Sequence, residues 1–203
     1  MTYLDTFDQP AKSKENTIEA GNYHFFYGGP YSQWAESHFN FFGLHFNTAE
    51  QFMMLGKAIV AHDRDSAVEI METPDPRDQK ALGRKVKDLP LEMWERDRYA
   101  IVLLGNFLKF TQNAAYRAVL DQHETVDLFV EASPTDKIWG IGLSEAQAQG
   151  TTPDQWNGTN LLGKVVTDIR DLLVFGQDFN YVFTKLGNGL MIMENGIEHM
   201  DLN

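Results

Sequence analysis

The sequence predicts a single compact α+β domain that is mainly α-helical, with a few short strands and a β-hairpin near its C-terminal end. Three observations lead to this expectation. The chain has 203 residues, which is enough for one domain with a full core and short for two. Apolar residues recur at helical spacing in several segments. Short runs of aromatic and β-branched residues, bounded by glycine or proline, predict strands between them.

The composition excludes several classes of protein. Hydrophobic residues make up 43% of the chain and charged residues 23%, as in ordinary globular proteins. No apolar run approaches the ~18–20 residues of a membrane span, and no leader-like segment opens the chain, so we expect a cytoplasmic protein without a membrane partner. The absence of cysteine excludes disulfides and thiolate chemistry. A net charge of −12 argues against a protein that coats nucleic acid, although it permits a local basic pocket for one phosphate group.

The first elements are a terminal arm, a strand and an aromatic stretch. Residues 1–21 are polar and lack periodicity, which is typical of a flexible N-terminal arm. Residues 23–27 have the composition of a strand, and a Gly-Gly-Pro sequence ends it. The stretch 31–46 is rich in aromatic residues, but their alternation is too irregular to define a strand.

Capping signals and apolar periodicity predict helices at 48–62, 63–71, 78–86, 91–110, 114–122 and 161–173. The first begins with the strong N-cap residues Asn47 and Thr48, followed three residues later by Glu50 and Gln51, so either register forms a capping box. The segment 91–110 is apolar on a wide face, which predicts a central core helix.

The remaining strand signals lie in the second half. Residues 128–132 predict a strand, followed by a turn and a second short strand at 138–141, and then by a polar loop at 144–155. The runs 181–183 and 190–193 flank a Gly-Asn-Gly sequence in a hairpin pattern.

We therefore divide the chain into the arm 1–21, a main domain at 22–176, and a C-terminal hairpin extension at 177–203 packed on the same domain.

The helix at 48–62 places a carboxylate and an amine on one side. Glu50 and Lys57 are seven residues apart, so at about 100° per residue they lie within roughly 20° of one another and about 10 Å apart along the axis. Met54 falls between them on the same face. Taken alone, this stretch favours a capping Glu50 and an exposed Lys57, although the same placement would let both side chains reach one ligand.

Other motifs point to no cofactor. The sequence from Gly158 to Lys164 matches G-x-x-x-x-G-K, but Val165 follows in place of Ser or Thr and no apolar strand precedes it, so we reject a nucleotide-triphosphatase loop. The following helix start is favoured as a simple cap, with anion binding by its N–H groups as the alternative. The six histidines lack metal-like spacing, and no G-x-S-x-G motif occurs. We expect neither a metal site nor another cofactor.

Two further segments have two interpretations each. The basic run 80–87 is typical of a solvated helix face, and it could also steer a phosphate-bearing substrate. The segment 131–142 combines acidic residues with tryptophan and glycine, so it forms either a tight turn with a packed Trp or a surface that approaches a flat ligand.

Six blocks of the sequence, in order, resemble the NADAR superfamily, also called YbiA-like proteins. They are Phe26-Tyr27; Ser37-His38-Phe39; Thr48 to Lys57, where the resemblance is strongest; Trp94 with Arg98; Lys109 to Asn113; and a last group of Glu131-Ala132-Ser133, Asp136, Trp139 to Gly142 and Asn160 to Lys164 leading to Arg170. Together they span residues 25–173. His38 stands where the family tends to have Asn, and Met54-Leu55-Gly56 where Gln-Ala is common.

The resemblance implies a hydrolase that cleaves a ribose N-glycosidic bond in a small-molecule nucleotide or ribose phosphate. Two substrate types are open: phosphorylated riboflavin-pathway intermediates, and ADP-ribose attached to guanine in nucleotides or at nucleic-acid ends. Cleavage develops positive charge on the ribose, which a carboxylate stabilises, and an acid must protonate the departing nitrogen or the ring oxygen. We assign the first role to Glu50, and the second, or the orientation of water, to Glu131 or Asp136. Lys57 could neutralise phosphate, tune Glu50 or attack an opened sugar as a Schiff base.

The resemblance also implies the substrate-binding residues. Trp94 or Trp139 would stack on the base. Lys109, Asn160 and Arg170 are the candidates for phosphate oxygens. The remaining candidates for substrate contacts are Tyr27, Ser37, Phe39 and Gly140.

Two functions of other classes stay open at this point. A module that binds ADP-ribose or a related nucleotide without turnover would share the aromatic and basic pocket, but it would not need Glu50 and would form no product. A structural or interaction domain would have no pocket, and nucleotides would leave its thermal stability unchanged.

Overall fold

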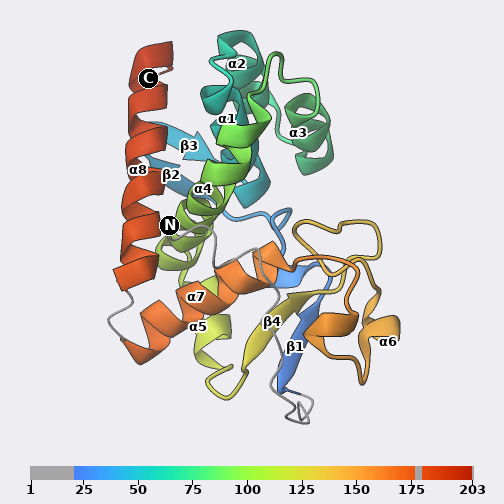
Figure 1. The fold of residues 1–203 in the computed structure, drawn as a ribbon. Coiled ribbons are helices and arrows are strands. Elements are labelled where there is room, and N and C mark those ends of the chain that lie inside the picture. Colours follow the sequence, from blue (N-terminus) through green and yellow to red (C-terminus); the bar gives the residue numbers. More distant parts are fainter. Residues whose placement is uncertain (1–20, 177–179, 203) are drawn as a thin grey trace.

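The computed structural model describes residues 21–176 and 180–202, which form helices around two small sheets (Figure 1). The α-helices of the described residues are α1 (Ala49–Val60), α2 (Arg64–Glu72), α3 (Pro76–Gly83), α4 (Leu91–Gln112), α5 (Ala114–Asp121), α6 (Glu145–Ala148), α7 (Leu161–Phe175) and α8 (Asn180–Met200). The strands are β1 (Tyr23–Phe26), β2 (Phe39–Phe41), β3 (Leu44–Phe46) and β4 (Leu128–Glu131). The expected mainly helical α+β class is confirmed. The expected arm at 1–21 lies, apart from Gly21, outside the described residues.

Strands β1 and β4 form a parallel pair, with Tyr23 opposite Leu128 and Phe26 opposite Glu131. Both strands therefore end at the same edge, and the amide of Ala132 extends the pairing by donating to the carbonyl of Phe26 at 2.8 Å. Helix α7 packs against β4. The carboxyl ends of parallel strands are a common location for ligand sites, and the segments after β1 and β4 both begin there.

The aromatic stretch 31–46 contains an antiparallel hairpin of two three-residue strands, β2 and β3, which the irregular alternation had not defined. Phe42 and Gly43 connect the strands, and both have positive φ, 48° and 80°. Two such residues in succession match the twist that a tight hairpin requires. The inward rings of Phe39 and Phe46 stack with their centroids 5.4 Å apart and cover Phe52 of α1.

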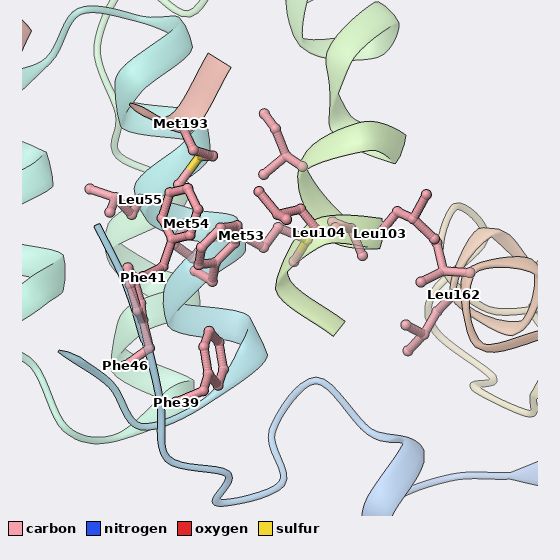
Figure 2. Close-up of a cluster of buried hydrophobic side chains, with 14 of the residues drawn as sticks. Phe39, Phe41, Phe46, Met53, Met54, Leu55, Leu103, Leu104, Leu162 and Met193 are labelled. Atoms are coloured by element: carbon pink, nitrogen blue, oxygen red, sulfur yellow. The ribbon is translucent and has the colours of Figure 1, made fainter. Parts of the chain in front are cut away.

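Helices α1 and α4 form the centre of the core, and α8 lies along both of them (Figure 1). Figure 2 shows Phe39, Phe41 and Phe46 gathered beside α1, with Met53 directed toward Leu104 of α4. Met193 of α8 joins the same cluster close to Leu55. The expectation of a core helix at 91–110 is thus confirmed, since Ala100 to Leu104 are all buried.

The predicted C-terminal hairpin is wrong, because residues 180–200 form the single helix α8. Its buried residues, Val182, Gly189, Met193, Ile197 and Met200, recur at helical spacing. Gly189 faces the carbonyl of Ala100, and a Cβ at this position would lie 2.4 Å from that oxygen. The glycine that suggested a turn therefore permits close packing of α8 on α4.

The second strand expected at 138–141 is also wrong, because these residues form a loop. Its carbonyl groups accept hydrogen bonds from the amides that begin α7: Leu161 donates to Ile138 at 3.1 Å and Leu162 to Trp139 at 3.0 Å. The loop therefore caps a helix, and its Ile141 donates to the carbonyl of Glu131 in β4 at 3.0 Å without forming a strand. Among the described residues, no helix is long and apolar enough to cross a bilayer.

Candidate active site

Glu50 is a buried carboxylate near the start of α1, and its side chain does not cap the helix. The side chain of Thr48 accepts from the amide of Gln51 at 3.0 Å, and Gln51 in turn accepts from the amide of Asn47 at 3.0 Å. The N-cap is therefore Thr48, and the side chain of Gln51 binds back to Asn47, one residue before the cap, so Glu50 takes no part in capping. The side chain of Glu50 is 1% exposed, and its Oε1 atom has no hydrogen-bond partner among the described residues. An unpaired buried oxygen is costly and needs a functional or structural reason.

Burial raises the pKa of Glu50 to about 7, and nearby charges partly oppose this shift. The cations of Lys80 and Arg84 and a hydrogen bond from the Trp34 side chain favour the ionised form, whereas Asp136 disfavours it. Glu50 is thus a carboxylate poised near neutral pH, with two cations and one N–H donor that stabilise its anion.

Glu131 is the second carboxylate of the site and lies at the carboxyl end of β4. Burial raises its pKa to about 7, with further increases from the charges of Asp136 and Glu50 and a decrease from Lys80. Its Oε2 atom is buried without a hydrogen-bond partner in the described part of the chain. Burial and its mainly acidic neighbours therefore make Glu131 retain a proton to higher pH than an exposed glutamate does.

Asp136 uses its two oxygens for different purposes. Oδ1 accepts from the amides of Ile138 and Trp139 at 2.9 and 2.8 Å, which fixes the turn of the loop. Oδ2 faces Lys80 Nζ at 3.9 Å. The structure therefore brings Glu50, Glu131 and Asp136 together, and it gives Asp136 a role in holding the loop and the neighbouring cation.

Helix α3 delivers the cations because it packs very closely on α1. A Cβ on Gly83 would lie 1.9 Å from the sulfur of Met54, the residue between Glu50 and Lys57 on their shared face. Lys80 and Arg84 stand on either side of Gly83 in the sequence, and their charges lower the pKa of Glu50. Burial and the charge of Arg84 lower the pKa of Lys57, while Glu50 raises it. Lys57 thus belongs to the same electrostatic cluster as Glu50.

Trp34 links this cluster to a surface pocket of about 400 Å³, formed by the segment 28–35 and Tyr116. Its side chain favours the ionised form of Glu50, and Lys80 Nζ lies 5.7 Å from the centre of its ring. The segment is held in place by the backbone: the amide of Glu50 donates to the carbonyl of Gln33 at 2.9 Å. Because Gln33 directly precedes Trp34, this hydrogen bond holds the backbone at Trp34 close to Glu50.

Helix α4 holds the segment 28–35 in place through two hydrogen bonds. Asn106 donates to the side-chain oxygen of Gln33 at 2.7 Å, and Lys109 Nζ donates to the carbonyl of Ser32 at 2.7 Å. Lys109 is 0% exposed, and burial lowers its pKa to about 7. Its placement makes it a support of the Trp34 segment, although the sequence had suggested a phosphate contact.

Other expected substrate contacts are also used within the fold. Asn160 accepts from the amide of Glu131 and donates to the carbonyl of Phe129, both at 2.9 Å, which joins the start of α7 to β4. Arg170 donates to the carbonyl of His123 at 2.7 Å and pairs with Asp171. Ser37 and Phe39 are each 1% exposed, so they contribute to the core. These residues support the site from behind, and none of them faces its surface.

The remaining candidates lie at the edges of the core. Trp94 and Trp139 are half-buried and pack against the main hydrophobic cluster. Gly140 is tightly enclosed, since a Cβ there would lie 2.9 Å from the carbonyl of Glu131. Tyr27 is 70% exposed and directly follows β1, next to the pocket-lining Gly28.

The amide groups at the start of α7 do not form an anion site. Asn160 donates to Gly140 at 3.2 Å, and the next two amides are occupied by the loop as described above. The interpretation as a plain helix start is thus the one that the structure supports. In the residues described, no three His, Asp or Glu side chains gather as metal ligands.

Sequence reasoning missed three members of the site: Trp34, Lys80 and Arg84. Lys80 and Arg84 belong to the basic run that was interpreted as a solvated face with a steering role, and their spacing of four residues places both on one side of α3. Trp34 carried no separate signal within an aromatic-rich stretch. Its position follows from the backbone contact between Gln33 and Glu50.

This fold and site define an α+β enzyme with a buried and a half-buried carboxylate in one cluster, and glycoside-cleaving enzymes use pairs of carboxylates. The NADAR domain model matches residues 19–174, and the chain therefore belongs to the NADAR family. An N-glycosidase of Acanthamoeba polyphaga mimivirus is 38% identical over 169 residues, which cover 76% of this chain and 98% of that protein. An N-glycosidase of Nostoc punctiforme is 28% identical over 140 residues, 66% of this chain and 82% of the relative. The protein is thus a NADAR-family N-glycosidase.

Two further proteins are similar to this chain. The Caenorhabditis elegans protein irg-1 is 37% identical over 138 residues, 67% of this chain and 65% of that protein. The solved NMR structure of the Escherichia coli protein YbiA matches with a TM-score of 0.63 at 21% identity, covering 83% of this chain and 95% of YbiA. The second similarity concerns the fold. Helix α8 begins after the last residue of the family match.

Proposed function

We propose that this N-glycosidase hydrolyses the bond between ribose and a base nitrogen in a phosphorylated riboside or an ADP-ribosylated base. Glu50 would stabilise the positive charge that develops on the ribose, and Glu131 would act as the general acid. The observation that carries this proposal is a pair of carboxylates, Glu50 buried and Glu131 half-buried, whose pKa values are both raised to about 7 while their neighbours differ in charge.

The difference in neighbours supports the division of roles. Glu50 has two cations and an N–H donor beside it, which favour the anion required next to an oxocarbenium-like ribose. Glu131 has two acids and one cation beside it, which favour the protonated form required of an acid catalyst. Burial raises both pKa values to about 7, so the division rests on the charged neighbours, which are mainly cations at Glu50, against one acid, and mainly acids at Glu131.

In the proposed reaction, Glu131 transfers its proton to the departing base nitrogen while the bond between that nitrogen and the anomeric carbon breaks. The electron pair of the bond stays with the base, and Glu50 stabilises the resulting cation on the ribose. Water then adds to the anomeric carbon, and its proton returns to Glu131, which restores the enzyme. The products are a free base and a ribose with a hydroxyl group at the anomeric position.

The cations of α3 support a phosphate-bearing substrate. Lys80 and Arg84 act on the carboxylate cluster in a chain whose net charge is −12, so they supply positive charge at the site of an otherwise acidic protein. Both substrate types contain phosphate groups attached to the ribose that is cleaved. A small nucleotide and the end of a nucleic-acid strand both meet this requirement when the phosphate reaches these two residues.

The test is to incubate the protein separately with a phosphorylated aminopyrimidine riboside and with ADP-ribosylated guanosine, and to follow release of the free base by chromatography. We expect base release from one of the two types. If both substrates stay intact with folded protein, the proposed function is wrong.

A further inference from the structure

The pocket beside Trp34 has the properties of a site for a planar ring. Its walls are the segment 28–35 and the ring of Tyr116, and most of its lining is apolar. Its volume of about 400 Å³ lies within the usual range for small-molecule sites. Gly28 and Gly29 have positive φ, 108° and 65°, and open space surrounds the positions where their Cβ atoms would be. The backbone can therefore come close to a flat ligand at this wall.

Both aromatic walls are held in fixed positions. The hydroxyl of Tyr116 donates to the carbonyl of Glu36 at 2.6 Å, and Lys109 Nζ lies 5.3 Å from the centre of its ring. Trp34 is anchored through Gln33 and Ser32, as described above. Rigid aromatic walls favour stacking because little conformational freedom is lost when a ring binds.

The pocket and the carboxylate cluster meet at Trp34. Trp34 lines the pocket, and Nζ of Lys80 from the cluster lies 5.7 Å from the centre of its ring, so a ligand in the pocket lies next to the cluster. The phosphate-facing cations, by contrast, come from α3. A substrate with a base on one side of its ribose and phosphate on the other would fill both regions at once.

We propose that the pocket between the segment 28–35 and Tyr116 binds the planar base that leaves during cleavage, stacked against the rings of Tyr116 and Trp34. This inference rests on the proposed function, since it names the part of the proposed substrate that the pocket binds. It makes Tyr116 a specificity-determining residue for the leaving base, with no role in binding the ribose phosphate.

The experiment measures binding of half-substrates by ligand-observed NMR titration, using free guanine, a free diaminopyrimidinone and ribose phosphate. The variants are Tyr116→Leu, which removes the aromatic ring, and Tyr116→Phe, which keeps the ring and loses the hydroxyl. Phe183→Leu is the matched control, because Phe183 is an aromatic residue that is 54% exposed on α8. Thermal unfolding checks that each variant is folded.

We expect a base to bind the wild type and Tyr116→Phe similarly, and to bind Tyr116→Leu about 10-fold more weakly, in line with the stacking contribution per base. Ribose phosphate should bind all variants equally. Unchanged base binding in Tyr116→Leu, or no base binding by the wild type, overturns the inference.

The two proposals fail in different ways. If a substrate is hydrolysed but Tyr116→Leu binds the base as tightly as the wild type, the pocket assignment is wrong and the proposed function stands. If Tyr116→Leu weakens base binding but neither substrate type is cleaved, the pocket assignment stands and the proposed function is wrong.

Discussion

Lys80 Nζ lies 3.9 Å from Oδ2 of Asp136, which ties helix α3 to the loop that follows β4. The two side chains are 32% and 23% exposed, so the ion pair itself contributes at most about 1 kcal/mol to stability. Its main consequence is electrostatic. Lys80 is held where it lowers the pKa values of both Glu50 and Glu131.

Replacing Lys80 should therefore move both sides of the pH dependence of activity. In Lys80→Met the pKa values of Glu50 and Glu131 both rise, so the pH profile of kcat/KM shifts to higher pH as a whole. Lys85→Met, at an exposed position just after α3, is the control and should leave the profile in place. An unshifted pH profile in Lys80→Met would show that Lys80 does not affect the ionisation of the catalytic carboxylates.

Trp34→Phe should change only one side of that profile. Phenylalanine keeps an aromatic ring but cannot donate to Glu50, so the pKa of Glu50 rises while that of Glu131 is unaffected. Because the proposed mechanism needs ionised Glu50, the acidic limb of the pH profile should shift to higher pH. The basic limb, which reports Glu131, should not move. A profile identical to that of the wild type would exclude a functional bond between Trp34 and Glu50.

Glu50→Gln should stabilise the fold at neutral and alkaline pH. The folded-state pKa of Glu50 is raised from 4.5 to about 7, so folded protein binds one more proton than unfolded protein between these values, and stability falls as pH rises through them. Glutamine escapes this penalty, which is on the order of 3 kcal/mol above pH 7 and vanishes toward pH 4.5. Urea unfolding of both proteins at several pH values measures the difference. Equal free energies of unfolding at pH 8 would show that burial of Glu50 is not costly.

Lys57 provides a test of covalent catalysis. Its lowered pKa leaves more neutral amine than an exposed lysine has, and a neutral amine is required for attack on an opened sugar aldehyde. If Lys57 acts in this way, borohydride with substrate should give a stable adduct on Lys57, detected by mass spectrometry, and Lys57→Arg should be inactive. No adduct together with an active Lys57→Arg variant would leave Lys57 with a purely electrostatic role.

The sequence predicted the local features of the site better than its tertiary contacts. The cap at Thr48 and Gln51 and the shared face of Glu50 and Lys57 follow from helix geometry, and α1 has both. The contacts of Glu50 with Trp34 and Lys80 join separate segments, so no local pattern contains them.

Buried polar residues were the hardest to interpret. Lys109, Asn160 and Arg170 have the chemistry of phosphate ligands, but each is at most 3% exposed and bonds to backbone carbonyls. A motif gives the residue type, whereas burial decides whether that residue faces a substrate or supports the loop that does. The helix α8 shows the same limit, because Gly189 indicates a turn locally and permits close packing on α4 in the fold.

The most direct test of the central claim compares base release by the wild type and by Glu50→Gln, with Glu69→Gln at an exposed position of α2 as the matched control. Glutamine keeps the size of the side chain and removes its charge. We predict that Glu50→Gln stays folded, binds ribose phosphate and releases base about 100-fold more slowly or worse, the loss typical of removing one electrostatic stabiliser, whereas Glu69→Gln retains full activity. A folded Glu50→Gln variant with wild-type kcat would contradict the account.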